Sequence, residues 1–161
     1  MTVKLTSHQV WEVIEKNIFG VIGMVTRKNE ARTVGLNYVV RDRRLYIGTS
    51  KNAWKVRHVQ QNPHVSLTIP VHKSVPLMPW IKVPPAAITF HGQGKIIAIE
   101  DAPPGVLQAL YSDSAEETHK MFDLCLIEVT PQKDFITYGI GVSLLEMRDP
   151  AQARGRAPVG L

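Results

Sequence analysis

The sequence has little cysteine and no long apolar run, and both shortages narrow its class. Cys125 is the only cysteine among the 161 residues, so the chain has no internal disulfide and the thiol has no cysteine partner at a metal site. Its strand-like surroundings predict a buried, inert thiol. No stretch approaches the roughly 20 apolar residues of a membrane span, and the N-terminus lacks a basic-then-apolar secretory signal. We therefore expect a cytoplasmic protein with no membrane partner.

Acidic residues are also scarce, but only in the first half. Residues 1–80 carry 12 Lys and Arg against 4 Asp and Glu, whereas residues 81–161 carry 7 against 10. The net charge of +5 is therefore concentrated in the first half. Such a basic half fits a nucleic acid bound over residues 27–57, a phosphorylated small molecule or a merely solvated surface, and charge alone does not choose among them.

The histidines are too scattered to form a metal-ligand motif. No two of them have the i, i+4 spacing, or the separation of two to four residues, that places two ligands in one element. We therefore expect no metal site. The six are His8, His58, His64, His72, His91 and His119.

Hydrophobic periodicity predicts a mainly β chain with short helices. Thr6 and Gln9 have capping-box spacing, and the helical pattern that follows ends at Gly20. A second helix is expected from a cap at Ser50 or Asn52, and a third over residues 103–120. Strands are expected over 21–26, 32–40, 45–49, 64–69, 87–99 and 125–138. About six strands and three helices suggest an antiparallel β-barrel, closed or partly closed, with flanking helices.

Two segments fall outside this regular pattern. Residues 70–85 contain five prolines among apolar and aromatic side chains, which predicts an ordered loop. That loop either covers a ligand or packs against a partner subunit, and we favour the second. We expect residues 1–148 to form one barrel domain and residues 149–161 to form a tail packed on the barrel or on a partner.

The junction around Thr49, Ser50 and Lys55 is the most informative stretch. A predicted strand ends in two hydroxyl residues, and a helix begins at once with a lysine in its first turn. Unpaired N–H groups at a helix start favour an anion, and the hydroxyls and the ammonium add donors. These residues therefore fit a phosphate cradle. They equally fit a helix cap with a solvated lysine.

The order and spacing of these features resemble the pyridoxamine 5′-phosphate oxidase-like FMN-binding split-barrel family over roughly residues 8–140. The matching pieces are Arg32-Thr33-Val34 in the second strand, Thr49 closing the third, Lys55 six residues later, Asn62-Pro63-His64-Val65-Ser66-Leu67 before the next strand, and Phe90-His91-Gly92-Gln93-Gly94-Lys95 in the strand with a central glycine.

The resemblance implies FMN as the cofactor and a homodimer with the cofactor in a groove between the subunits. Thr49, Ser50 and Lys55 would bind the phosphate, and the strand around Thr33 would lie along the flavin ring. Gln93 or His91 would come from the other chain. The residues assigned to FMN in this way are Arg32, Thr33, Val34, Asn37, Thr49, Ser50, Lys55 and Gln93.

The sequence also departs from the family. Ala53-Trp54 stand where pyridoxamine phosphate oxidases carry a Ser-Arg pair, and the C-terminus has no Arg-Leu-x-Pro-type tail. We therefore expect no true pyridoxamine phosphate oxidase. The resemblance implies an FMN-dependent oxidoreductase that passes hydride or electrons to an unknown small molecule and has no assigned catalytic residue. The alternative is a non-catalytic flavin-, deazaflavin- or heme-binding protein on the same barrel, with His64, His72 or His91 as an axial heme ligand.

Overall fold

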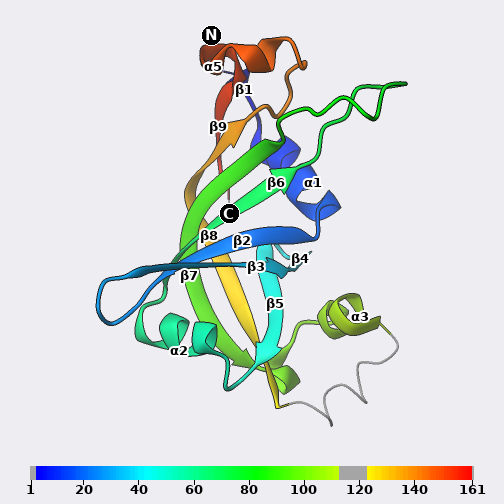
Figure 1. The fold of residues 1–161 in the computed structure, drawn as a ribbon. Coiled ribbons are helices and arrows are strands. Elements are labelled where there is room, and N and C mark those ends of the chain that lie inside the picture. The colour runs from blue at the N-terminus through cyan, green and yellow to red at the C-terminus, as the bar shows by residue number, and fades with distance from the viewer. Residues whose placement is uncertain (1–2, 113–122, 161) are drawn as a thin grey trace.

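The computed structural model describes residues 3–112 and 123–160. Within them, nine strands join into one sheet, and most of these strands alternate inward and outward side chains. The elements in chain order (Figure 1) are β1 Val3–Lys4, α1 Ser7–Lys16, β2 Phe19–Val25, β3 Ala31–Asn37, β4 Val39–Arg41, β5 Arg44–Ser50, α2 Trp54–Gln61, β6 His64–Val71, β7 Ala86–Ala98, η1 Ile99–Asp101, α3 Val106–Tyr111, β8 Leu124–Tyr138, η3 Glu146–Arg148, α5 Pro150–Ala153 and β9 Arg154–Pro158.

The sheet follows the order β1-β9-β8-β7-β6-β2-β3, and β8 also pairs with β5, which in turn pairs with β4. Every pairing is antiparallel except that of β1 with β9, so the sheet is mixed. β3 and β5 contact each other but are not paired, so the sheet does not close into a barrel. With 45% strand, the chain is mostly β with flanking helices, which confirms the predicted split-barrel fold class.

The core lies inside the curved sheet and is closed at one end by α1. Phe135 of β8 is fully buried in this core. Its ring stands edge-on to that of Trp11 of α1, with 5.3 Å between the ring centroids, and to that of Phe90 of β7, with 5.4 Å between them. The predicted capping box of Thr6 and Gln9 is present, so the start of α1 was encoded locally. The predicted end of this helix, at Gly20, was wrong. α1 stops at Lys16, and Ile18 lies beyond it with 68% of its surface exposed.

Two further predicted boundaries were wrong. The strand expected over 32–40 is broken at Tyr38, which lies between β3 and β4. The Tyr38 side chain is buried, and its hydroxyl donates a hydrogen bond of 2.8 Å to the Ile14 carbonyl oxygen. The second helix is not capped by Ser50 or Asn52. Its N-cap is Ala53, because Ser50 still belongs to β5 and Asn52 to the turn after it. Of the helix expected over 103–120, residues 113–120 lie outside the described residues.

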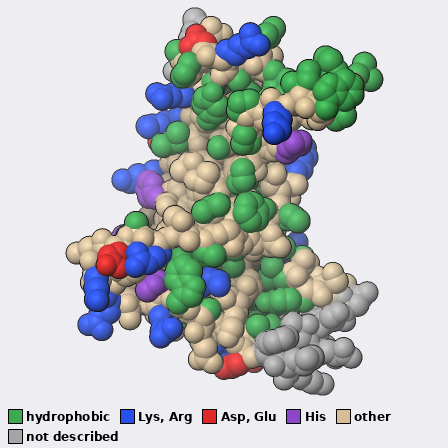
Figure 2. All heavy atoms as spheres, in the orientation of Figure 1, with side chains coloured by type: hydrophobic (Ala, Val, Ile, Leu, Met, Phe, Trp, Pro, Cys, Tyr) green, Lys and Arg blue, Asp and Glu red, His purple; other side chains and the backbone are tan. Residues whose placement is uncertain are grey.

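The proline-rich segment is a long irregular loop, as predicted. It connects β6 to β7 and stands away from the sheet (Figure 1), and its tip gathers hydrophobic side chains (Figure 2). Leu77 is 94% exposed and Trp80 75% exposed. Such an apolar tip in water is typical of a contact surface.

β9, at Arg154–Pro158, is a strand that the sequence pattern did not predict. β9 lies between β8 and the short β1, so β1 and β9, from opposite ends of the sequence, are neighbours at one edge of the sheet. Ala153, Ala157 and Val159 are buried there. No helix among the described residues is long and apolar enough to cross a membrane.

Candidate functional site

The end of β5 directs its two hydroxyl residues to opposite faces, because consecutive strand side chains alternate. Thr49 lies on the face of Leu45 and Ile47, is only 8% exposed, and is directly opposite Cys125 on β8. Ser50 is exposed on the other face, where its hydroxyl oxygen accepts a hydrogen bond of 3.3 Å from the Asn52 backbone N–H. The two predicted phosphate ligands of β5 are therefore separated by the strand itself.

The start of α2 has features that suit an anion. Its N-cap, Ala53, has no side chain that can accept from the free N–H groups, and the first turn holds no acidic residue. Lys55 lies in that turn and, within the described residues, forms no ion pair. Lys51, in contrast, is paired with Asp123 at 2.8 Å. Lys55 is therefore a cation at this helix end that is left for an external anion.

The thiol of Cys125 shows that Thr49 and Lys55 lie at the same end of the sheet. Burial raises its pKa, the charge of Asp123 raises it further, and Lys51 and Lys55 act in the opposite direction. Lys55 is thus close enough to influence a group that lies directly opposite Thr49. Burial has the largest effect, so the pKa is raised overall. The predicted burial of Cys125 is confirmed, and its low reactivity stays a prediction.

A second set of candidate residues forms a row across the outer face of the sheet. Strand register aligns Thr33 of β3, Gly23 of β2, Ser66 of β6 and His91 of β7. Gly23 leaves room for the Ser66 side chain in this row, because a Cβ at position 23 would lie 2.6 Å from the Ser66 hydroxyl oxygen. A groove of about 320 Å³ follows the row and includes Arg32, Thr33, His64 and Ser66.

Gln93 joins this groove through His64. Its amide nitrogen lies 3.4 Å from the His64 Nδ1, and the two residues are paired on β7 and β6. α2 packs against both β2 and β7. Its Val59 lies in the core beside the buried Gly94 of β7, so the helix covers the inner face of the sheet, whereas the groove lies on the outer face.

The remaining predicted residues are less favourably placed for a ligand. Arg32 is held by Glu30 of the same hairpin, with 2.6 Å between guanidinium and carboxylate. Val34 is half-buried and packs against the core. Asn37 is exposed at the end of β3, opposite Phe19. The backbone of β3 is better placed to bind a ligand, because this strand ends the sheet order and its outer edge pairs with no strand in the described part of the chain.

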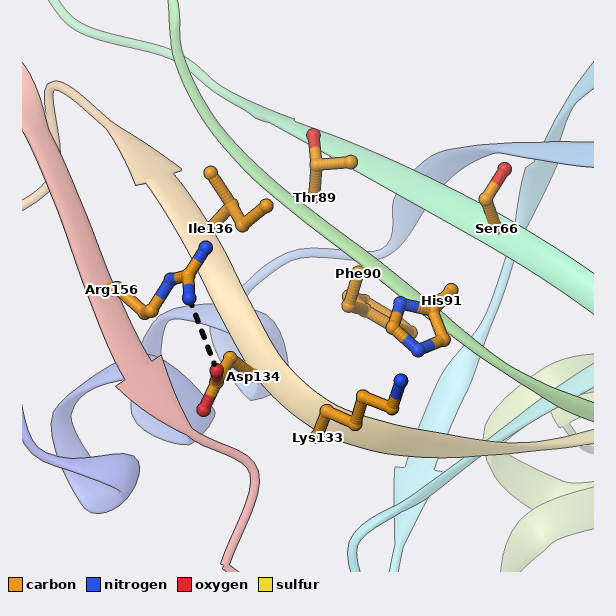
Figure 3. A pocket seen from close by; sticks show the side chains of 8 residues that line it. All are labelled: Ser66, Thr89, Phe90, His91, Lys133, Asp134, Ile136 and Arg156. Carbon is orange, nitrogen blue, oxygen red and sulfur yellow. Dashed lines mark ion pairs between the residues drawn. The ribbon is translucent and has the colours of Figure 1, made fainter.

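A neighbouring groove was not found from the sequence. It has a volume of about 260 Å³ and runs along β7, β8 and β9 (Figure 3), with Ser66 shared between the two grooves. Strand alternation makes His64, Ser66 and Thr68 point outward together, and that signal was available in the sequence. The contributions of Lys133 and Arg156 depend on the pairing of β8 with β9, for which the sequence had no local signal.

The described residues contain no group of three or more His, Cys, Asp or Glu side chains that could hold a metal ion. The donors around both grooves are hydroxyl, amide, imidazole and cationic groups. Such groups suit an organic anion or a polar ring system.

Comparison with known proteins decides the family. The sequence pattern described as pyridoxamine 5′-phosphate oxidase matches residues 6–136. The chain belongs to this family. No curated protein is similar enough in sequence to count as a relative. The matched region contains β5, α2 and the outer-face row, but not β9.

Solved structures share the fold at low sequence identity. The heme storage protein HutZ from Vibrio cholerae is 14% identical, with a TM-score of 0.65 over 83% of this chain and 95% of that chain. A FAD-binding protein from Mesorhizobium loti is 17% identical, with a TM-score of 0.58 over 80% and 90%. An F420 reductase is 14% identical, with a TM-score of 0.50 over 75% and 91%. At these identities the likeness establishes the fold alone.

Proposed function

We propose that the chain binds FMN at the β5–α2 junction and works as an FMN-dependent oxidoreductase on a small molecule. The observation that carries this proposal is the uncapped start of α2 beside Thr49 and Lys55. A phosphate monoester would satisfy the free N–H groups and the unpaired ammonium together. The residues present therefore fit the phosphate of FMN.

The flavin ring would lie along β3. Because no strand in the described part of the chain pairs with the outer edge of β3, every second residue directs its N–H and C=O groups away from the sheet. Such alternating donors and acceptors match the pyrimidine edge of a flavin. Thr33 and Ser66 add hydroxyls on the adjoining outer face. Bound FMN supplies hydride or electron transfer, while these groups bind and orient it.

The proposal includes a homodimer with FMN between the subunits. The outer face carries an apolar side chain that a monomer would leave in water, Phe19, which is 45% exposed. The projecting loop between β6 and β7 adds a second apolar surface. Burial of both surfaces against a second copy would stabilise the assembly.

The absorption spectrum of the purified protein, with mass identification of any released cofactor, tests the proposal directly. Lys55→Ala should weaken FMN binding about 10-fold or more, because a hydrogen bond to a charged group contributes about 1.5–3 kcal/mol. Lys51→Ala is the matched control, since it removes the same charge at the same end of the sheet from a lysine already paired with Asp123. Equal FMN retention in both variants would contradict the cradle.

A measured turnover separates an enzyme from a carrier. We expect a reduced nicotinamide or a flavin reductase to bleach the bound flavin, and a small-molecule acceptor to restore its absorption. Bleaching without any acceptor turnover would favour a carrier protein. Light scattering during gel filtration tests the dimer, and a monomer that retains FMN fully would contradict the interface site.

Heme binding is the second candidate, and one observation favours it. His64 and His91 both point outward on the adjacent strands β6 and β7, where His91 pairs with Ser66, two residues along from His64. An exposed imidazole of this kind can ligate heme iron. A Soret band on titration with hemin, lost in His64→Ala or His91→Ala but kept in Lys55→Ala, would replace the FMN proposal. Release of F420, a deazaflavin, would instead change only the identity of the ring system.

A further inference from the structure

The groove along β7, β8 and β9 is built around a defect in the strand pairing. Thr89 pairs with Ile136, and the next paired residue on β7, His91, pairs with Gln132. Phe90 therefore faces three residues of β8, 133–135, instead of one. Such bulges redirect side chains and are enriched beside functional sites.

The backbone at the bulge is strained and held by the fold. Lys133 has a φ of 61°, in the left-handed region, which costs a residue with a side chain about 1–2 kcal/mol. Phe90 and Phe135 turn inward and contact each other edge-on at 5.4 Å, which anchors the bulge in the core. The Val159 N–H donates to the Lys133 carbonyl oxygen at 2.9 Å. Lys133 thus projects from a fixed backbone.

The lining of the groove has an excess of positive charge. Lys133, Arg156 and His91 reach it, and the one carboxylate among its described lining residues, Asp134, is paired with Arg156 at 3.6 Å. In Figure 3 the Lys133 ammonium and the His91 ring point toward the same space. Because Asp134 is paired with Arg156, the charge of Lys133 is not balanced by another described lining residue.

The rest of the lining is hydroxyl on one side and apolar on the other. Ser66 and Thr89 lie on the β6 and β7 side, and the Thr89 hydroxyl is also 3.2 Å from that of Thr68. Ile136, 52% exposed, forms an apolar wall. The groove therefore combines an anion site with a surface suited to a flat or aliphatic group.

We propose that this groove binds a small organic anion, with Lys133 and His91 holding its carboxylate or phosphate and Ile136 contacting its apolar part. Because Ser66 lines this groove and also the one assigned to the flavin ring, the anion would lie beside the ring as its substrate. That role as substrate rests on the proposed function. The anion site itself rests only on the groove.

Benzoate and inorganic phosphate are suitable probes, because they separate a carboxylate with an apolar ring from a bare phosphate. Each is titrated into the full chain at constant ionic strength, and the imidazole proton signals of His91 are followed by NMR. Saturable binding of either probe supports the site and identifies the preferred acid group. Absence of binding by both overturns the proposal.

The Lys133 variants test the assignment without disturbing the bulge. Lys133→Asn removes the charge and tolerates the left-handed backbone, so it should fold and bind the preferred probe about 10-fold more weakly. Lys133→Arg should retain binding. Lys82→Ala, an exposed lysine on the loop between β6 and β7, controls for the overall change in charge. Equal losses in Lys133→Asn and Lys82→Ala would overturn the site.

FMN absorption and probe binding test the FMN site and the anion site independently. Lys133→Asn should leave the visible absorption of bound FMN unchanged. Failure of the FMN experiments with intact probe binding removes only the role as substrate. Failure of probe binding in a chain that retains FMN removes only the anion site.

Discussion

Thr49 and Cys125 lie directly opposite each other on β5 and β8, and the next pair along, Ser50 and Leu124, faces the other side of the sheet. This register gives the two adjacent hydroxyls different surroundings. Thr49 is buried at the end of the sheet where Lys55 also lies. Ser50 is exposed on the opposite face, and its hydroxyl oxygen accepts a hydrogen bond from Asn52 in the turn that follows β5.

Thr49 and Ser50 should therefore differ in their effect on FMN. Thr49→Val keeps the shape of the side chain and removes the hydroxyl, so we expect FMN to bind roughly 10-fold more weakly through the loss of a hydrogen bond to a charged phosphate. Ser50→Ala should change the affinity by less than about two-fold, well under the effect of one such bond. Fluorescence titration of the apoprotein with FMN measures both. A larger effect in Ser50→Ala would reverse the assignment.

The Cys125 thiol should react slowly in the folded protein. It is buried, and burial raises its pKa, so little thiolate is present near neutral pH and reagents cannot reach it. We expect labelling with a disulfide reagent to be about 100-fold slower than in denaturant, since modification requires opening of the fold. Labelling at the denatured rate in native buffer would show that this end of the sheet is open.

Tyr38 should contribute measurably to stability through its bond to α1. Tyr38→Phe leaves the Ile14 carbonyl oxygen with the N–H of Asn17, 3.2 Å away, so no buried acceptor loses all of its partners. We therefore expect the free energy of unfolding to fall by about 1 kcal/mol, the usual net value of one hydrogen bond. Urea denaturation measures this change, and an unchanged m-value would confirm that the native state is otherwise intact.

The same residue predicts the behaviour of the protein at high pH. Burial raises the pKa of Tyr38 above its ordinary value of about 10. Its contribution to stability is therefore complete below about pH 10 and is lost as the pH rises through the higher native pKa. The free energy of unfolding should fall above pH 10, and less steeply in Tyr38→Phe. Part of the slope should remain, because the pKa values of Tyr46 and Tyr111 are raised as well.

The loop between β6 and β7 should affect oligomeric state. Leu77 and Trp80 are its most exposed apolar residues, so the double change Leu77→Ser and Trp80→Ser removes most of the apolar tip. If the tip packs on a partner, gel filtration with light scattering should show a dimer that dissociates at about 10-fold higher concentration, as expected for the loss of two apolar anchors. An unchanged dimer with altered substrate turnover would identify the loop as a lid.

Much of the fold followed from local patterns in the sequence. Thr6 and Gln9 placed the start of α1, alternating residues placed most strands, and Val56 and Val59 identified the buried face of α2. The junction of Thr49 with Lys55 was visible because a strand end and a helix start adjoin within a few residues. Each of these signals depends on contacts between near neighbours in the chain.

The tertiary structure decided what depends on contacts between distant residues. Tyr38 breaks its strand because α1 offers a carbonyl oxygen, and β9 forms because β8 presents an edge. The row of Thr33, Gly23 and Ser66 and the bulge at Lys133 arise from strand register. The sequence alone determined a mainly β chain, and it predicted a helix start suited to an anion. Only the folded sheet decided which side chains share a groove, because a shift of one residue in register turns every outward side chain inward.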